Sequence, residues 1–218
     1  MADPRGLTRR QAALKRAFDV VTASIGLVLT SPLLAAGWVA ATVSTRQNGL
    51  FRQERVGLGG EPFVVLKLRT MRSVPGQHST VTARGDVRIT RTGAWLRRFK
   101  IDELPQLLNV LRGEMSLVGP RPDVPGYADL LEGDDRILLT VRPGVTGPAA
   151  LAYRHEEQIL SAVPDPERHN REVIWPEKVR INRRYVESWT FRGDLACLWA
   201  TVRSAGSRSP EPVKEVVP

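Results

Sequence analysis

Asp102 and Glu103 form an acidic pair inside the segment KIDELPQLLNVLRGEMSLVGPRP, which covers residues 100–122. The pair stands just before Pro105, at the predicted start of a helix over roughly 103–112. One interpretation is structural, because Asp is a common N-cap and an acidic first turn complements the helix dipole. The other interpretation is chemical, and it depends on the neighbouring residues.

Those neighbours are basic. Three cations precede the pair in the chain: Arg97, Arg98 and Lys100. Arg121 follows between Pro120 and Pro122, which restrict the backbone that carries its guanidinium. A helix N-terminus beside arginines is typical of a phosphate site. In such a site one carboxylate can hold Mg²⁺ together with substrate phosphates, and the other can attack phosphorus. We expect the positive surroundings to keep both carboxylates ionised.

Other basic residues beside Gly- and Pro-containing turns are further candidates for phosphate binding. They are Lys67, Arg69, Arg88, Arg91, Arg142 and Arg154. For each residue alone, a solvated surface position is an equally good interpretation. Their repeated position next to turns favours an anion-binding site when they are considered together.

An uncharged segment over residues 20–45 is long enough, as a helix, to cross the ~30 Å hydrocarbon core of a bilayer. Ser31–Pro32 lies near its middle, where proline removes a backbone donor and disfavours helix at the preceding residue. Basic residues flank both ends, among them Lys15, Arg16 and Arg46, whereas a spanning helix usually has its excess of Lys and Arg on one side. We therefore predict a helix–break–helix hairpin that re-enters the cytoplasmic face and contacts anionic membrane lipids. An ordinary kinked transmembrane helix is the alternative.

Composition narrows the class of partner. The chain has 218 residues and a formal net charge of +9, which indicates an anionic partner. Nucleic acid is not expected, because the arginines lie beside turns and no nucleic-acid-binding motif is visible. A non-catalytic protein that binds an anionic membrane surface is a further alternative. The single cysteine, Cys197, excludes an intrachain disulfide and lies in an apolar run typical of a core.

The predicted fold class is α+β, with a compact cytoplasmic catalytic domain on an N-terminal re-entrant hairpin. The predicted organisation has four segments. They are a basic juxtamembrane segment (1–17), the membrane hairpin (18–46), the catalytic domain (47–203) and a disordered tail (204–218). Within the catalytic domain we expect a strand at 63–68 and a polar loop at 73–86. We also expect helical regions at 126–139 and 171–203.

Five segments of the chain carry a resemblance to a known family: KRAFDVVTASIGLVLTSP, FRQERVGLGGEPFVVLKLRTM, DVRITRTGAWLRR, IDELPQLLNVLRGEMSLVGPRP and RPGVTG. In this order they resemble the bacterial sugar transferases, the monotopic phosphoglycosyl transferases that start polysaccharide and glycoconjugate assembly. The similarity covers roughly residues 13–203. The resemblance implies transfer of a sugar-1-phosphate from a nucleotide diphosphate sugar, usually a UDP-sugar, to a polyprenyl phosphate such as undecaprenyl phosphate, with release of UMP.

The resemblance also implies roles for single residues. Asp102 would be the nucleophile that forms a covalent phosphosugar intermediate, and Glu103 would help to hold Mg²⁺. The family's Ser-Pro helix break falls on Ser31–Pro32, its Pro-Arg-Pro loop on residues 120–122, and its second phosphate arginine on Arg154. Many members read GLAQVNGR where this chain reads GPAALAYR, so base and sugar contacts are not assigned to that loop.

Overall fold

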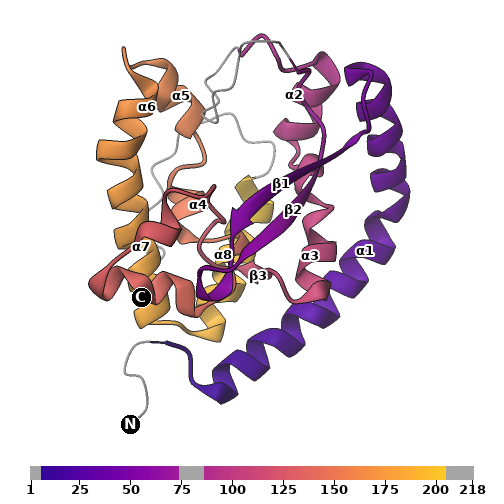
Figure 1. Ribbon diagram of the computed structural model, residues 1–218. Helices are drawn as coiled ribbons and strands as arrows, with labels where there is room; N and C mark the ends of the chain where they lie inside the picture. Colours follow the sequence, from indigo (N-terminus) through magenta and orange to yellow (C-terminus); the bar gives the residue numbers. More distant parts are fainter. Residues whose placement is uncertain (1–5, 74–85, 205–218) are drawn as a thin grey trace.

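The computed structural model describes residues 6–73 and 86–204 (Figure 1). Apart from their end residues, the loop predicted at 73–86 and the disordered tail predicted at 204–218 lie outside the described residues. In chain order the helices are α1 (Arg9–Thr45), α2 (Arg91–Arg98), α3 (Gln106–Arg112), α4 (Pro148–Ala152), α5 (Glu156–Ser161), α6 (Pro166–His169), α7 (Trp175–Glu187) and α8 (Phe191–Ser204). The strands are β1 (Leu50–Val56), β2 (Pro62–Leu68), β3 (Ser116–Val118) and β4 (Gly144–Thr146).

Helix and sheet are mixed, as predicted, and the helices lie around two small sheets. Figure 1 shows α1, α2 and α3 on one side of the β1–β2 hairpin, and α4 to α7 on the other. The hairpin is antiparallel, with Leu50 opposite Leu68 and Phe51 opposite Lys67. The strand predicted at 63–68 is therefore confirmed as part of β2.

Two short strands lie where the sequence indicated loops. β3 and β4 pair in parallel, with Ser116 opposite Gly144. Each has three residues, which is too short to leave a pattern of alternating polar and apolar residues. The region predicted as helical at 126–139 forms 3₁₀ turns at Ala128–Leu130 and Gly133–Thr140. Cys197 is buried in the core, as predicted.

Helix α1 is continuous over 37 residues, so the interruption predicted at Ser31–Pro32 is absent. Pro32 cannot donate to the carbonyl of Val28, four residues before it. The Ser31 hydroxyl donates to that carbonyl at 2.9 Å instead, and the Thr30 hydroxyl donates to the carbonyl of Gly26 at 2.7 Å. The bond from Ser31 compensates for the missing amide donor of Pro32 within the helix. Figure 1 shows that α1 still changes direction along its length.

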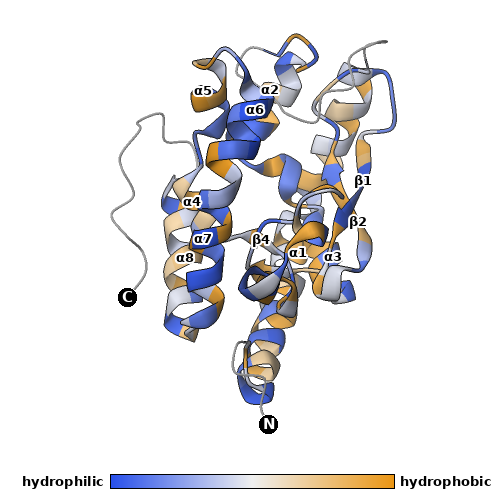
Figure 2. Ribbon diagram, turned by 60° about the vertical axis from the view of Figure 1, so that its left-hand side comes forward, coloured by the Kyte–Doolittle hydropathy of each residue, from blue (hydrophilic) through white to orange (hydrophobic). Residues whose placement is uncertain are grey.

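The middle of α1 exposes apolar side chains. Val28 and Leu29 are each 74 % exposed, and Val43 is 73 % exposed. In Figure 2 the hydrophobic colour is concentrated along α1, whereas α6 is hydrophilic. Among the described helices, α1 is the one long and apolar enough to cross a bilayer, judged by length and composition. An apolar surface of this extent indicates a nonaqueous neighbour.

The residues of α1 that precede Ser31–Pro32 are called its first arm here, and those that follow are called its second arm. Buried charges attach the first arm to the globular part of the protein. Lys15 Nζ lies 2.5 Å from Asp194 Oδ2 on α8. Asp194 also accepts hydrogen bonds from the Tyr185 hydroxyl at 2.7 Å and from Trp189 Nε1 at 3.1 Å. One turn after Lys15, the buried Asp19 carboxylate accepts from the backbone amide of β3. Burial of charges is tolerated here because each has a partner.

Arg16 completes this attachment at the end of α3. Its two terminal nitrogens donate to the carbonyls of Val110 and Leu111, at 2.5 and 2.9 Å. These are carbonyls of the last turn, which a helix leaves without an internal partner. The prediction that Lys15 and Arg16 face anionic lipid is therefore wrong, because both side chains bind the protein.

The second arm of α1 packs on the same globular part. Ala41 is fully buried and forms a small core cluster with Leu68, Leu96 and Ile101. Those three residues come from β2, α2 and the turn that carries the acidic pair. Both arms of α1 thus contact one domain, and the predicted division between residues 1–17 and 18–46 falls inside a single helix.

We expect Lys15→Met to lower the free energy of unfolding by about 3–5 kcal/mol, because it leaves the Asp194 carboxylate buried without its cation. In a chain of this size that corresponds to a fall in Tm of roughly 6–20 °C, measurable by thermal unfolding in detergent. Arg10→Met, at an exposed position one and a half turns earlier, is the matched control. A Tm for Lys15→Met equal to that of this control would contradict the prediction.

Candidate active site

The acidic pair lies in a short 3₁₀ turn, Ile101–Glu103, between α2 and α3. Lys100 adopts a left-handed conformation with φ of 57°, which ends α2 and lets the chain turn. Asp102 and Glu103 are 8 % and 9 % exposed. Gly113 caps the far end of α3 with φ of 84°, so the helix ends as predicted but begins three residues later.

Asn109 fixes the distance between the acidic pair and β2. It is fully buried, and its side-chain amide pairs with the backbone of β2 as a neighbouring strand would. Its Oδ1 accepts from the Leu66 amide at 3.0 Å, and its Nδ2 donates to the Val64 carbonyl at 2.7 Å. Lys67 is the next residue of β2 after Leu66, and its side chain reaches the turn that carries Glu103. Sequence reasoning assigned Asn109 no role, although it lies within the quoted motif.

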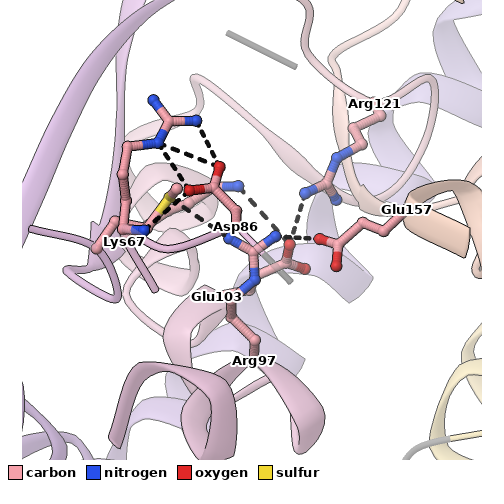
Figure 3. A network of polar contacts seen from close by, with 8 residues as sticks. Lys67, Asp86, Arg97, Glu103, Arg121 and Glu157 are labelled. Atoms are coloured by element: carbon pink, nitrogen blue, oxygen red, sulfur yellow. Dashed lines mark hydrogen bonds and ion pairs between the residues drawn. The ribbon is translucent and has the colours of Figure 1, made fainter. Parts of the chain in front are cut away.

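Glu103 is held by two cations. Its Oε1 accepts from Arg121 at 2.6 Å and lies 3.7 Å from Lys67 Nζ. Figure 3 shows Arg121 and Glu103 pointing toward each other from separate parts of the chain. Burial alone would raise the pKa of Glu103, but the charges of Arg121 and Lys67 outweigh it and hold the pKa below its usual range. Glu103 is therefore ionised, as predicted.

Asp102 has the opposite environment. Its Oδ1 is buried and makes no hydrogen bond within the described part of the chain, so it does not act as an N-cap. Burial and the neighbouring Glu103 charge raise its pKa, against the opposing charges of Lys67, Lys100 and Arg97. The expectation that the positive surroundings keep both carboxylates ionised is thus supported for Glu103, whereas the environment of Asp102 raises its pKa. A carboxylate oxygen without a donor keeps its lone pairs free to react or to bind a metal.

The loop that carries Arg121 is held from two sides. Gly119 and Gly144 bring β3 and β4 into close contact, and a Cβ on Gly144 would lie 2.2 Å from the Gly119 nitrogen. The Gly144 amide donates to the carbonyl of Pro120 at 2.7 Å. On the other side, Arg55 of β1 donates to the carbonyl of Pro122 at 3.2 Å. The Pro-Arg-Pro loop is therefore fixed at both prolines, and Arg121 is directed to Glu103.

Lys67 and Arg55 lie on the same face of the hairpin, since alternate residues of a strand share a face and Lys67 pairs with Phe51. Burial and the nearby Arg121 charge lower the pKa of Lys67 to about 8 and that of Arg55 to about 10. Burial also raises the pKa of Asp123, which follows the loop, to about 7. Arg55 and Asp123 were not among the predicted site residues. Their position in or beside the quoted motifs was the feature of the sequence that could have identified them.

Arg97 joins α2 to α5. It forms an ion pair with Glu157 and contacts the sulfur of Met71 at 3.8 Å (Figure 3). Its charge also acts on Asp102. Arg98, the residue predicted for the site, is exposed and lies over the Phe99 ring at 5.3 Å. The helix thus directs Arg97, one residue earlier, toward the acidic pair.

The other predicted phosphate ligands have individual contacts. Arg69 donates to the carbonyl of Asn48, and Arg142 donates to the carbonyl of Gly113. Arg88 pairs with Asp86 at 2.6 Å, and Arg154 donates to His155 at 3.0 Å. Their role in phosphate binding stays a prediction. Arg69 and Arg142 support the backbone on either side of the site.

The altered loop, GPAALAYR, has its own packing. Its residues Pro148–Ala152 form α4, and Tyr153 follows. Lys178 lies 5.6 Å from the centroid of the Tyr153 ring and bonds both carboxylate oxygens of Glu156, at 2.7 and 2.6 Å. The tyrosine that replaces a glycine of the common pattern is therefore part of a contact between α5 and α7.

The acidic pair fits Mg²⁺ only in company with a substrate. Among the described residues, no group of three or more His, Cys, Asp and Glu side chains could hold a metal. Mg²⁺, however, is commonly held by one or two carboxylates together with substrate phosphates. The ionised Glu103 carboxylate meets that requirement.

A buried carboxylate pair flanked by Arg121 and Lys67 is an arrangement suited to phosphoryl chemistry. Residues 10–208 match the bacterial sugar transferase family, and the chain belongs to that family. It is therefore an enzyme, a phosphoglycosyl transferase.

Three relatives show the range of this similarity. The chain is 39 % identical over 195 residues to a UDP-glucose:undecaprenyl-phosphate glucose-1-phosphate transferase of Caulobacter vibrioides, covering 87 % of this chain and 68 % of that protein. It is 42 % identical over 128 residues to a putative undecaprenyl-phosphate N-acetylgalactosaminyl 1-phosphate transferase of Bacillus subtilis. That match covers 58 % of this chain and 72 % of the Bacillus protein. It is 33 % identical over 204 residues to the exopolysaccharide production protein ExoY of Rhizobium meliloti, covering 86 % and 83 %.

We expect kcat/KM for the donor substrate to fall as the pH rises through about 8, where Lys67 of the free enzyme loses its proton. The sign follows from burial, which favours the neutral amine and lowers the pKa. In Lys67→Arg the guanidinium stays charged, so this alkaline limb should disappear. The measurement is the pH profile of transferase activity from pH 6 to about 10. An unchanged alkaline limb in Lys67→Arg would contradict the assignment.

Proposed function

We propose that this enzyme transfers a sugar-1-phosphate from a UDP-sugar to a polyprenyl phosphate, such as undecaprenyl phosphate, and releases UMP. The names of the Caulobacter and Bacillus relatives support both the lipid acceptor and the transferred group. The observation that carries the proposal is the difference between the two carboxylates: Asp102 has an unpartnered oxygen, and Glu103 is held by cations. The transfer would be a first membrane step in polysaccharide or glycoconjugate synthesis.

The reaction divides into two displacements. In the first, a carboxylate oxygen of Asp102 attacks the phosphorus that carries the sugar, an O–P bond forms, and the P–O bond to UMP breaks. In the second, an oxygen of the polyprenyl phosphate attacks the same phosphorus, and the Asp102 carboxylate leaves unchanged. Arg121 and Lys67 offset the negative charge on the phosphoryl oxygens in both steps. Mg²⁺ bound by Glu103 and substrate phosphates would supply further charge neutralisation.

We also propose that α1 re-enters the cytoplasmic face of the membrane, so that the protein is monotopic. Two contacts support this topology. Lys15 on the first arm binds Asp194, and Ala41 on the second arm packs against Leu68. A spanning helix would take its two ends to opposite sides of the bilayer, but one globular domain holds both arms of α1. The apolar residues between the arms, such as Val28 and Leu29, then enter the lipid.

Asp102→Asn should abolish UMP release, because the amide is a far weaker nucleophile, with loss of at least about 1,000-fold in kcat expected for a lost covalent step. Glu103→Gln keeps the nucleophile and should retain measurable activity at a raised Mg²⁺ requirement. UMP is measured with detergent-solubilised enzyme, a panel of UDP-sugars, undecaprenyl phosphate and Mg²⁺. Release that survives Asp102→Asn would remove Asp102 as the nucleophile.

Cysteines at Arg10→Cys and Gln47→Cys test the topology, because these exposed positions lie near the two ends of α1. Both should escape an impermeant maleimide in intact spheroplasts and react after permeabilisation. The native Cys197 gives little background, since burial raises the pKa of its thiol to about 11. Labelling of one position from outside intact spheroplasts would instead indicate a spanning helix.

A further inference from the structure

Two buried polar atoms near the start of α3 are unpartnered, and they are chemically complementary. Among the residues that the structure describes, none donates a hydrogen bond to Asp102 Oδ1 and none accepts one from Gln106 Nε2. Gln106 is 1 % exposed, and Asp102 is 8 % exposed. Buried donors and acceptors are nearly always paired in folded proteins. In the described part of the chain, two of the four buried side-chain atoms without a partner are these two.

The two side chains come from adjoining turns of the chain. Asp102 lies in the 3₁₀ turn Ile101–Glu103, and Gln106 is the first residue of α3. Both side chains are buried at this junction.

We propose that Gln106 is a positioning residue for the nucleophile. In the donor-bound enzyme its amide N–H donates to Oδ1 of Asp102, which leaves Oδ2 as the oxygen that attacks phosphorus. The inference rests on the proposed function of Asp102. Nothing in the roles already assigned to Lys67, Glu103 and Arg121 fixes the orientation of the Asp102 carboxylate about its own bond to the chain.

The chemistry of a carboxamide suits this task. A lysine or arginine at position 106 would add a positive charge beside Asp102 and form an ion pair with it, as Arg121 does with Glu103. A carboxamide donates a neutral hydrogen bond and adds no charge. It can therefore orient one oxygen of Asp102 and leave the other free.

Gln106→Met separates this role from packing, because methionine has a similar length and volume but no donor. In the free enzyme it removes no hydrogen bond of the side-chain amide, so Tm should be unchanged or higher. For the UDP-sugar that the wild type uses best, kcat of UMP release should fall by about 10- to 100-fold, as expected for a misoriented reacting group. KM for the donor should change less than about threefold. Gln158→Met, at an exposed position on α5, is the matched control and should match the wild type in both measurements.

A second variant, Gln106→Glu, places another carboxylate beside Asp102 and should lower kcat further while Tm falls. The inference is overturned if Gln106→Met keeps the wild-type kcat. It is equally overturned if Gln106→Met lowers Tm by several degrees and the remaining folded enzyme has normal kcat, which is the signature of a structural glutamine. Absence of UMP release from the wild type with every donor would overturn the proposed function itself, and this inference with it.

Discussion

The ion pair between Glu103 and Arg121 holds together three parts of the chain that carry the site. Glu103 comes from the turn before α3, Arg121 from the loop after β3, and the third charge, Lys67, from β2. A buried carboxylate is tolerated only when it is paired, and two neighbouring cations repel each other unless an anion lies between them. Glu103 meets both requirements, so the cations stay in place before any phosphate arrives. Asn109 and the paired glycines of β3 and β4 keep the three parts at this distance.

Adjacent carboxylates can take different roles because their contacts differ. Glu103 accepts from a guanidinium, and its pKa is held low; Asp102 faces no donor, and its pKa is raised. Two neighbouring carboxyl groups can take different roles wherever their environments shift their pKa values in opposite directions. A cation close to Asp102 would favour the ionised form of its carboxylate.

The sequence identified the residues that meet around the acidic pair better than it identified the contacts of their neighbours. Asp102, Glu103, Arg121 and Lys67 were all predicted, because their residue types and the Pro-Arg-Pro pattern report directly on local chemistry. The contacts of Arg69 and Arg142 with backbone carbonyls were not, because a basic residue beside a turn looks the same whether it binds phosphate or protein. The different surroundings of Arg97 and Arg98, one half-buried and one exposed, could not be predicted because the direction of a side chain depends on where α2 begins. No role was predicted for Gln106 and Asn109, because a polar residue within a helix has the same local pattern whether it is exposed or buried.

Prediction of the fold from the sequence was limited in the same way, because contacts between distant parts of the chain leave no local pattern. The strand at 63–68 had a clear apolar run, but β3 and β4 exist through the close approach of two glycine-containing segments that are distant in sequence. The break at Ser31–Pro32 followed from local proline rules, yet the Ser31 hydroxyl donates to the carbonyl that Pro32 leaves without a donor, and the helix continues. Lys15 was assigned to lipid because its partner, Asp194, lies 179 residues away. Such long-range partners leave no local pattern.

The most direct test of this account is a reaction with the UDP-sugar donor and Mg²⁺ in the absence of any polyprenyl phosphate. The account predicts a burst of UMP no larger than one equivalent per enzyme. It also predicts a mass increase equal to one sugar phosphate on the peptide that contains Asp102. UMP release that requires the lipid acceptor from the first turnover, with no adduct on that peptide, would contradict the covalent mechanism.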